Sequence, residues 1–321
     1  MDSPLAFLMR YRQLRVRYAD PTLSTAAAPV TEEVVVSLRR YLSAVDDPCN
    51  NKKKFKTEEA RKTCKSDPEM AEKRQDFVDF LENHLRPKDR VLPDGPGMGE
   101  ARLAVNRAFN GKGSPEDCET ALQWAVEKGE CPPGQANVQQ YCDDHLGLDC
   151  NGFVDRFFRR GEAHLPSEYV AGRSPTIRNS LDEVERGDCL LWCDKTGKVF
   201  AFPPDRHIAL VERTVLAASL RPKHIDSFES SFDVSRLSIG RRIHVVESTG
   251  GLGPSESFYA VRAVKTDKKG RTIFQVFRPR KGTLSWVRIV PGLILEFRAV
   301  RKWAPGFFRD LKKSAERALA K

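Results

Sequence analysis

A cysteine in the middle of the chain stands where nucleophilic chemistry is favourable. Cys150 lies in the segment 147–154 (Gly-Leu-Asp-Cys-Asn-Gly-Phe-Val), and we expect a helix to begin there, with Asp149 as its N-cap and Gly152 leaving room in the first turn. A free thiol titrates too high to be a good nucleophile, but a helix N-terminus or a nearby imidazolium lowers its pKa. The N–H of Cys150 would also stabilise an oxyanion. The segment therefore indicates a nucleophilic thiol.

The base for such a thiol is a histidine on another element. His207 lies in the segment 205–211, at the mouth of an apolar strand, from which its ring would point into a cleft. A third polar group must orient the imidazole through its other nitrogen. Glu247 and His244 both lie on the strand predicted over 241–247, three residues apart, so they point to opposite faces. One of the two can face His207, and the strand pattern alone leaves both open.

Four segments, in this order along the chain, resemble the NlpC-type family of papain-like cysteine peptidases, whose relatives include amidases and acyltransferases. Residues 148–154 resemble the family's Asp-Cys-Ser-Gly-Leu-Val nucleophile segment, and residues 185–192 resemble its x-Pro-Gly-Asp-Leu-Val-Phe-Phe lead-in to a strand. Residues 206–211 are similar to His-Val-Gly-Ile-Tyr, and residues 245–249 to the strand that carries the third polar residue. The resemblance covers about residues 140–300 and selects Glu247 rather than His244.

The resemblance implies an amide hydrolase with the triad Cys150, His207 and Glu247 and with no metal or other cofactor. The thiolate attacks an amide carbonyl, the histidine protonates the leaving amine, and water hydrolyses the thioester. The implied substrate is a peptide, specifically a peptidoglycan stem peptide, so the chain would be a bacterial cell-wall thiol peptidase or amidase. Further candidates for contacts to the substrate or the oxyanion are Asp149, Tyr141, His145 and His244.

The chain departs from the family pattern at three places. Asn151 replaces the usual serine after the nucleophile. The aromatic-Gly-Gly approach to the nucleophile is missing, and Tyr141 is the nearby tyrosine that would replace its aromatic. The stretch between the histidine and the glutamate carries an insertion, residues 213–241, rich in serine and charge. The last two differences bear on substrate specificity, because these loops line the cleft in the family.

The order of predicted elements gives an α+β fold. Helices are predicted over 31–46, 67–85 and 114–128, so residues 1–130 form a mainly helical N-terminal region. Residues 131–303 form the papain-like (NlpC-type) domain, in which the nucleophile helix packs on an antiparallel sheet, and residues 304–321 form a basic amphipathic helix. The strands are predicted over 189–193, 207–211, 242–247, 258–265, 272–278, 284–290 and 294–300.

Composition and charge are those of a globular protein. Hydrophobic residues make up 40% of the 321 residues and charged residues of both signs 31%. No apolar run reaches the roughly 18–20 residues of a membrane span. The first residues also lack the basic start and apolar run of a secretory signal. We therefore expect no transmembrane segment, and a protein that is cytoplasmic or exported without a classical signal peptide.

The eight cysteines do not form a metal-binding pattern. No Cys-x-x-Cys pair occurs, and Cys189 and Cys193 are four residues apart with no second pair, which disfavours zinc. In an oxidising compartment, a disulfide would be expected between Cys49 and Cys64 and another between Cys118 and Cys131.

The basic residues gather near the C-terminus. Residues 261–321 hold 17 Lys and Arg against four acidic residues, an excess larger than the net +10 of the whole chain. Such a segment is either a solvated face or a binding surface for an anionic polymer or membrane. The alternative function is therefore a catalytically inactive papain-like binding module that docks an anionic partner through its C-terminus.

Overall fold

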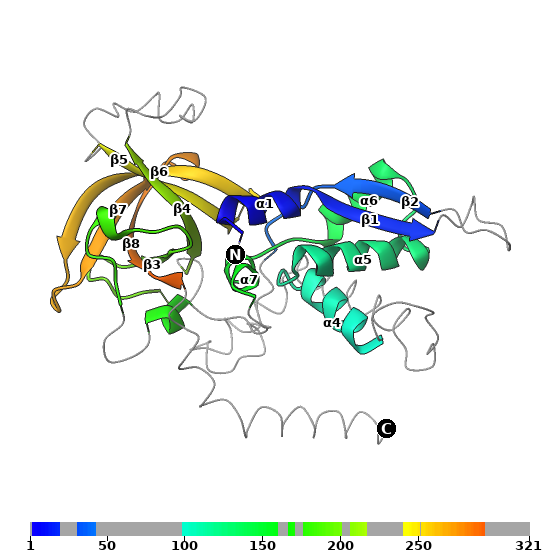
Figure 1. The fold of residues 1–321 in the computed structure, drawn as a ribbon, viewed down its shortest axis with the longest axis horizontal. Coiled ribbons are helices and arrows are strands. Elements are labelled where there is room, and N and C mark those ends of the chain that lie inside the picture. The colour runs from blue at the N-terminus through cyan, green and yellow to red at the C-terminus, as the bar shows by residue number, and fades with distance from the viewer. Residues whose placement is uncertain are drawn as a thin grey trace, which may run out of the picture.

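The computed structural model shows an α+β protein whose main sheet is a closed barrel (Figure 1). None of the described helices is long and apolar enough to cross a membrane. The structure describes residues 2–19, 31–42, 98–159, 166–170, 176–200, 206–216, 240–250 and 252–292.

The barrel consists of six antiparallel strands in chain order. Each strand pairs with the next, and the last strand, β8, pairs back with β3 through residues such as Leu190 opposite Ile289. The expected strands over these segments are confirmed, with ends that differ by a few residues. The strands are β3 (Cys189–Cys193), β4 (Ile208–Leu216), β5 (Arg241–Thr249), β6 (Gly253–Thr266), β7 (Thr272–Arg278) and β8 (Thr283–Val290).

Alternate residues of every strand fill the barrel. The inward positions form one apolar cluster to which all six strands contribute, including Leu190, Val245 and Phe274. The intervening outward positions, such as Leu191 and Val246, belong to a second cluster with the helices. This separation follows from the two-residue period of a strand, because successive side chains point to opposite faces.

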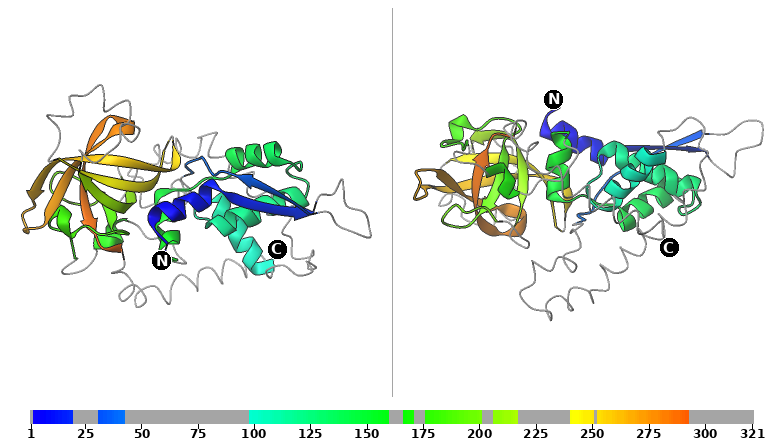
Figure 2. Two further views of the ribbon diagram at one scale, coloured as in Figure 1. Left: turned by 45° about the horizontal axis from the view of Figure 1, so that its top comes forward. Right: turned by 90° about the horizontal axis from the view of Figure 1, so that it is seen from below.

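The N-terminal elements and the nucleophile helix lie beside the barrel. Figures 1 and 2 show the barrel at one end, a two-stranded hairpin with three helices at the other, and α1 and α7 between them. The described residues also include the short 3-10 turns η1 (Pro166–Val170), η2 (Leu181–Glu183) and η6 (Pro279–Lys281). The helices are α1 (Pro4–Arg12), α4 (Met98–Phe109), α5 (Pro115–Glu127), α6 (Gln135–His145) and α7 (Cys150–Phe157), and the hairpin strands are β1 (Leu14–Ala19) and β2 (Thr31–Val36).

The helix predicted over 31–46 is wrong. Residues 31–36 form β2, antiparallel to β1, with Val34 and Val36 buried and Val35 exposed. The run of β-branched valines explains the difference, because these side chains favour a pleated surface over a helix. The helix predicted over 114–128 is confirmed as α5, capped by Ser114 in a capping box.

Several expectations fall on residues outside the described ranges. These are the helix over 67–85, the strand over 294–300, the basic segment 304–321 and the cysteine pair Cys49 and Cys64.

The N-terminal region shares its core with the nucleophile helix. The Phe7 ring of α1 lies 5.6 Å from the Phe153 ring and 5.7 Å from the Phe157 ring of α7, measured between centroids. Leu8 and Tyr11 are buried in the same cluster. The expected boundary near residue 130 stays a prediction, and packing is continuous on both sides of it.

Phe153 tests how strongly this shared core stabilises the fold. Because its ring is fully buried between α1 and the barrel, Phe153→Ala should lower the free energy of unfolding by about 3–5 kcal/mol. The measurement is urea denaturation followed by circular dichroism. Val264→Ala, at an exposed position of β6, should cost less than about 1 kcal/mol. Equal losses in the two variants would contradict the shared core.

Candidate functional site

The start of α7 is held by a buried carboxylate. Asp149 is the N-cap, and its Oδ1 accepts a hydrogen bond from the N–H of Gly152 at 2.5 Å. Its Oδ2 forms an ion pair with Lys112. Burial raises the pKa of Asp149, and the charge of Lys112 and the Gly152 N–H partly offset this rise. Asp149, expected as the N-cap and as a substrate or oxyanion candidate, therefore acts as a cap with its carboxylate already occupied.

Backbone contacts from three other elements fix the same helix start. The N–H of Asp149 donates to the Gly111 carbonyl at 2.9 Å, and the N–H of Leu148 donates to the Arg40 carbonyl at 3.1 Å. Ser248 of β5 donates to the Leu148 carbonyl at 2.5 Å. A Cβ on Gly152 would lie 2.3 Å from the Gly111 carbonyl oxygen, so only glycine permits this approach. Cys150 is thus positioned by both the N-terminal region and the barrel.

His207 and Glu247 meet at one rim of the barrel. The imidazole Nε2 lies 2.5 Å from the Glu247 Oε2, and both side chains are buried. Glu247 has the parity of the inward positions Val245 and Ile243, so it points toward the barrel interior. The structure therefore places Glu247, and not His244, beside His207.

Two further residues of the rim hold Glu247 in its ionised form. The Tyr259 hydroxyl donates to the Glu247 Oε1, and the Arg278 Nη2 lies 3.4 Å from the Oε2. Arg278 Nε also donates to the Tyr259 oxygen at 3.1 Å. Burial alone would raise the pKa of Glu247, but its hydrogen bond to His207 and the charges of His207 and Arg278 lower it to about 2. The carboxylate is therefore charged throughout the neutral range.

The thiol and the imidazole interact directly. Cys150 and His207 lie close enough for each to shift the pKa of the other, and Nδ1 is the ring nitrogen left to face the thiol because Nε2 faces Glu247. The thiol also donates a long hydrogen bond to the Asn151 Oδ1 at 3.9 Å. Burial alone would raise the pKa of the Cys150 thiol, but the interaction with the His207 imidazole and its charge outweigh burial and lower this pKa. Burial alone would lower the pKa of His207, but Cys150 and Glu247 raise it. Both shifts favour a thiolate–imidazolium pair.

A cavity of about 640 Å³ opens onto this pair. Cys150 and His207 line it, together with two tryptophans, Trp192 and Trp286. The Trp192 ring packs edge-on against the His207 ring, with centroids 4.4 Å apart. Tyr41, from the segment after β2, also lines the cavity. A ligand in this cavity would contact the thiol directly.

The other candidate residues lie away from the cavity. Tyr141 and His145 pack on each other on α6, with ring centroids 4.3 Å apart, and neither belongs to the cavity lining. His244 points outward from the barrel, where its Nε2 lies 2.8 Å from Glu256 and its ring stacks on Phe258. None of the three is placed to bind a substrate at Cys150.

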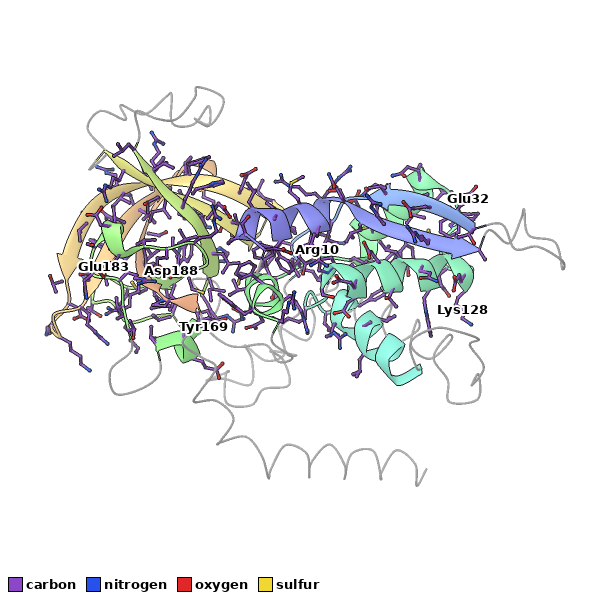
Figure 3. All side chains as sticks on the ribbon, in the orientation of Figure 1. Arg10, Glu32, Lys128, Tyr169, Glu183 and Asp188 are labelled. Atoms are coloured by element: carbon purple, nitrogen blue, oxygen red, sulfur yellow. The ribbon has the colours of Figure 1, made fainter. Side chains whose placement is uncertain are left out.

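The polar turn before β3 is a structural feature. Asp188, labelled on the barrel side in Figure 3, accepts hydrogen bonds from Arg178 at 2.8 and 3.0 Å. It also accepts one from the Glu185 N–H at 2.9 Å. This segment fixes the lead-in to the strand that carries Trp192.

The described cysteines are free thiols. The disulfide expected between Cys118 and Cys131 is not formed, and both side chains are buried. The Cys131 thiol donates instead to the Pro132 carbonyl at 3.3 Å. Among the residues that the structure describes, no group of three His, Cys, Asp or Glu side chains is arranged to hold a metal ion.

Sequence reasoning missed Lys112, Tyr259 and Arg278. Lys112 is 37 residues from its partner Asp149, and nothing local links the two. Tyr259 and Arg278 reach the site only through the pairing of β5, β6 and β7. A usable signal exists for Arg278, because it ends an apolar strand at an inward-facing position.

Glu247→Gln tests the electrostatic coupling of the three side chains. Without the negative charge the imidazolium is less stable, so the pKa of His207 should fall and that of Cys150 should rise. Since each pKa unit changes the thiolate fraction about tenfold, labelling of Cys150 by iodoacetamide near pH 6 should slow about tenfold or more. Mass spectrometry of the labelled peptides gives the rate.

Glu256→Gln is the matched control, because Glu256 pairs with the outward-facing His244. Its labelling rate should equal that of the unchanged protein. Equal rates in the Glu247 and Glu256 variants would rule out the coupling.

Comparison with known proteins identifies no relative of this chain. No protein-family model, no curated protein and no solved structure matches it. Function must therefore be inferred from the arrangement of the site: a buried thiol at a helix N-terminus that interacts with an imidazole, which an ionised carboxylate orients.

Proposed function

We propose that the chain is a cysteine hydrolase that cleaves an amide or peptide bond. One observation carries the proposal: the buried His207 imidazole is hydrogen-bonded to Glu247 on one side and faces the Cys150 thiol on the other, and the thiol lines a cavity. A thiolate needs a proton acceptor, and the acceptor needs a fixed orientation, so these three groups in this order suit nucleophilic catalysis.

In the first step the Cys150 thiolate attacks the amide carbonyl. The carbonyl oxygen becomes an oxyanion, which needs hydrogen-bond donors. The first N–H groups of a helix have no partner within the helix, and here the Asp149 side chain accepts the hydrogen bond from Gly152, while the Phe153 N–H begins the helical series by donating to the Asp149 carbonyl. The N–H groups of Cys150 and Asn151 come before them, and we assign the oxyanion to that of Cys150.

In the second step the tetrahedral intermediate collapses. The C–N bond breaks, and the His207 imidazolium gives its proton to the leaving amine. The neutral imidazole then takes a proton from water, which attacks the thioester and releases the acid and the Cys150 thiol. Glu247 keeps the ring oriented and stabilises its charged form, held in turn by Tyr259 and Arg278.

The arrangement supports a papain-like, NlpC-type assignment. The nucleophile begins a helix, α7, that contacts β4 and β5, and the histidine and the glutamate come from that side of the barrel. The family resemblance implies this combination for residues 140–300. We therefore propose a peptidoglycan stem peptide as the substrate and an endopeptidase or amidase activity on it.

Cys150→Ala tests the reaction. The unchanged protein should release fragments from purified peptidoglycan that mass spectrometry identifies by the amide bond cleaved, and Cys150→Ala should release none above background, because no other group forms the thioester. Cys131→Ala, a free cysteine outside the cavity, should keep the activity. Equal cleavage by the two variants would exclude a cysteine mechanism. Cleavage of unrelated peptides alone would reject the cell-wall substrate and retain the hydrolase.

The pH dependence of kcat/KM should be bell-shaped. The reactive form is the thiolate with the imidazolium, so activity rises with pH as the pair first loses a proton, below the usual pKa of a thiol. It falls again as the imidazolium deprotonates, above the usual pKa of histidine. The measurement is the initial rate on a fluorogenic peptide amide. An acid limb at the pKa of an ordinary thiol would contradict the lowered pKa of Cys150.

A further inference from the structure

The cavity at Cys150 carries an excess of positive charge. Arg206, Arg278 and Lys281 line it, against one acidic lining residue among the described ones, Asp194. Asp194 is occupied within its own turn, where its Oδ1 accepts hydrogen bonds from the N–H groups of Thr196 at 2.7 Å and Lys198 at 3.0 Å. Asp194 keeps its negative charge and Glu247 pairs with Arg278, but the three cationic side chains still outnumber these two carboxylates.

Arg278 is fixed on one side and available on the other. Its Nε and Nη2 are used by Tyr259, Glu247 and Thr249, and its guanidinium lies 4.8 Å from the centroid of the Trp192 ring. Within the described ranges its Nη1 has no hydrogen-bond partner, and it is not among the fully buried polar atoms. Arg278 also lies close enough to interact electrostatically with Cys150. Because the guanidinium is already held in place, binding a ligand to it costs little side-chain conformational entropy. Its planar geometry also suits a carboxylate.

Lys281 stands next to Arg278 on the cavity wall. It ends the turn η6, which Gly282 closes in the left-handed conformation with φ of 60°. Burial, and then the charge of Arg278, lower the pKa of the Lys281 ammonium. No acidic side chain in the described part of the molecule forms an ion pair with it. An anion between the two cations would relieve their repulsion.

Two large apolar side chains lie on the cavity wall beyond the two cations. Trp286 and Leu284 of β8 line the cavity, alternating with the hydroxyl residues Thr283 and Ser285, and Leu284 is 48% exposed. Apolar side chains beside the cations keep water from part of the wall, which strengthens the attraction between a bound anion and the cations.

We propose that Arg278 and Lys281 form a carboxylate-binding subsite beside Cys150, so that the substrate is an acidic peptide whose carboxylate lies near the amide that is cleaved. This subsite deepens the proposed hydrolase function and rests on it for the reaction, although the binding itself needs no chemistry at the thiol. Lys281 acts here as a residue that determines specificity, and Arg278 serves both Glu247 and the ligand.

Two alkylating probes that differ only in charge test the subsite. N-iodoacetylglycine carries a carboxylate, and N-iodoacetylglycinamide carries a neutral amide in its place. The rate of labelling by N-iodoacetylglycine is divided by the rate of labelling by N-iodoacetylglycinamide, once for Cys150 and once for glutathione. The ratio for Cys150 divided by the ratio for glutathione should exceed one. In Lys281→Gln this ratio should fall about three- to tenfold, and high salt should reduce it in the unchanged protein.

Lys269→Gln is the charge-matched control. Lys269 is exposed in the turn before β7, at the end of that strand opposite to Arg278, so the ratio should not change. A ratio that is the same in Lys281→Gln and in the unchanged protein would overturn the subsite. Slow labelling of Cys150 by both probes, no faster than the other cysteines, would instead overturn the hydrolase.

If both probes label Cys150 slowly, a binding measurement still tests the subsite. The Cys150→Ala protein is titrated with N-acetylglutamate and with N-acetylglutamine, followed by the fluorescence of Trp192 and Trp286, which line the cavity. We expect a saturable change with N-acetylglutamate at lower concentration than with N-acetylglutamine, and a loss of this difference in the double variant that adds Lys281→Gln. Equal responses to both compounds would reject carboxylate binding.

Discussion

The buried ion pair between Asp149 and Lys112 is the constraint on which the site depends. A carboxylate without water must be compensated, and here one oxygen caps α7 while the other meets the ammonium. The same pair ties the loop that precedes α5 to the helix that carries Cys150. Elements that are distant in the sequence thus set the position of the thiol. The N-terminal region is for this reason part of the site and not an appendage to it.

The charges of the site alternate from the cavity into the barrel rim. Thiolate, imidazolium, carboxylate and guanidinium follow one another through Cys150, His207, Glu247 and Arg278. Each buried charge has an opposite neighbour, which offsets part of its cost of desolvation. The arrangement also explains why the pKa of the thiol falls although the thiol is buried: the favourable charge of His207 is itself stabilised from behind by Glu247.

The strands of the main sheet and the three residues that meet at the site could be predicted from the sequence because both depend on short-range patterns. The closure of the sheet into a barrel was not expected, because it depends on the pairing of β3 with β8, which are distant in the sequence. The strands show β-branched runs, and the alternation along β5 permits either Glu247 or His244 at the site but not both. The hairpin strand at 31–36 was missed because its Thr-Glu-Glu start is typical of a helix, while its pairing with β1 requires a distant partner. Lys112 could not be predicted for a similar reason: it acts through Asp149, which only the folded chain brings near it. Arg278 was missed although its inward-facing position at the end of an apolar strand was readable, because its partner Glu247 lies on another strand.

The closure of the barrel has a consequence for how any peptide can bind. Peptides often attach to proteins by adding a strand to an open sheet edge, where unpaired backbone groups accept them. In the barrel as described, β3 and β8 pair with each other, so the sheet offers no such edge. A peptide therefore cannot bind by adding a strand to the barrel. A peptide that enters the cavity beside the barrel has to be recognised there by its side chains and charge.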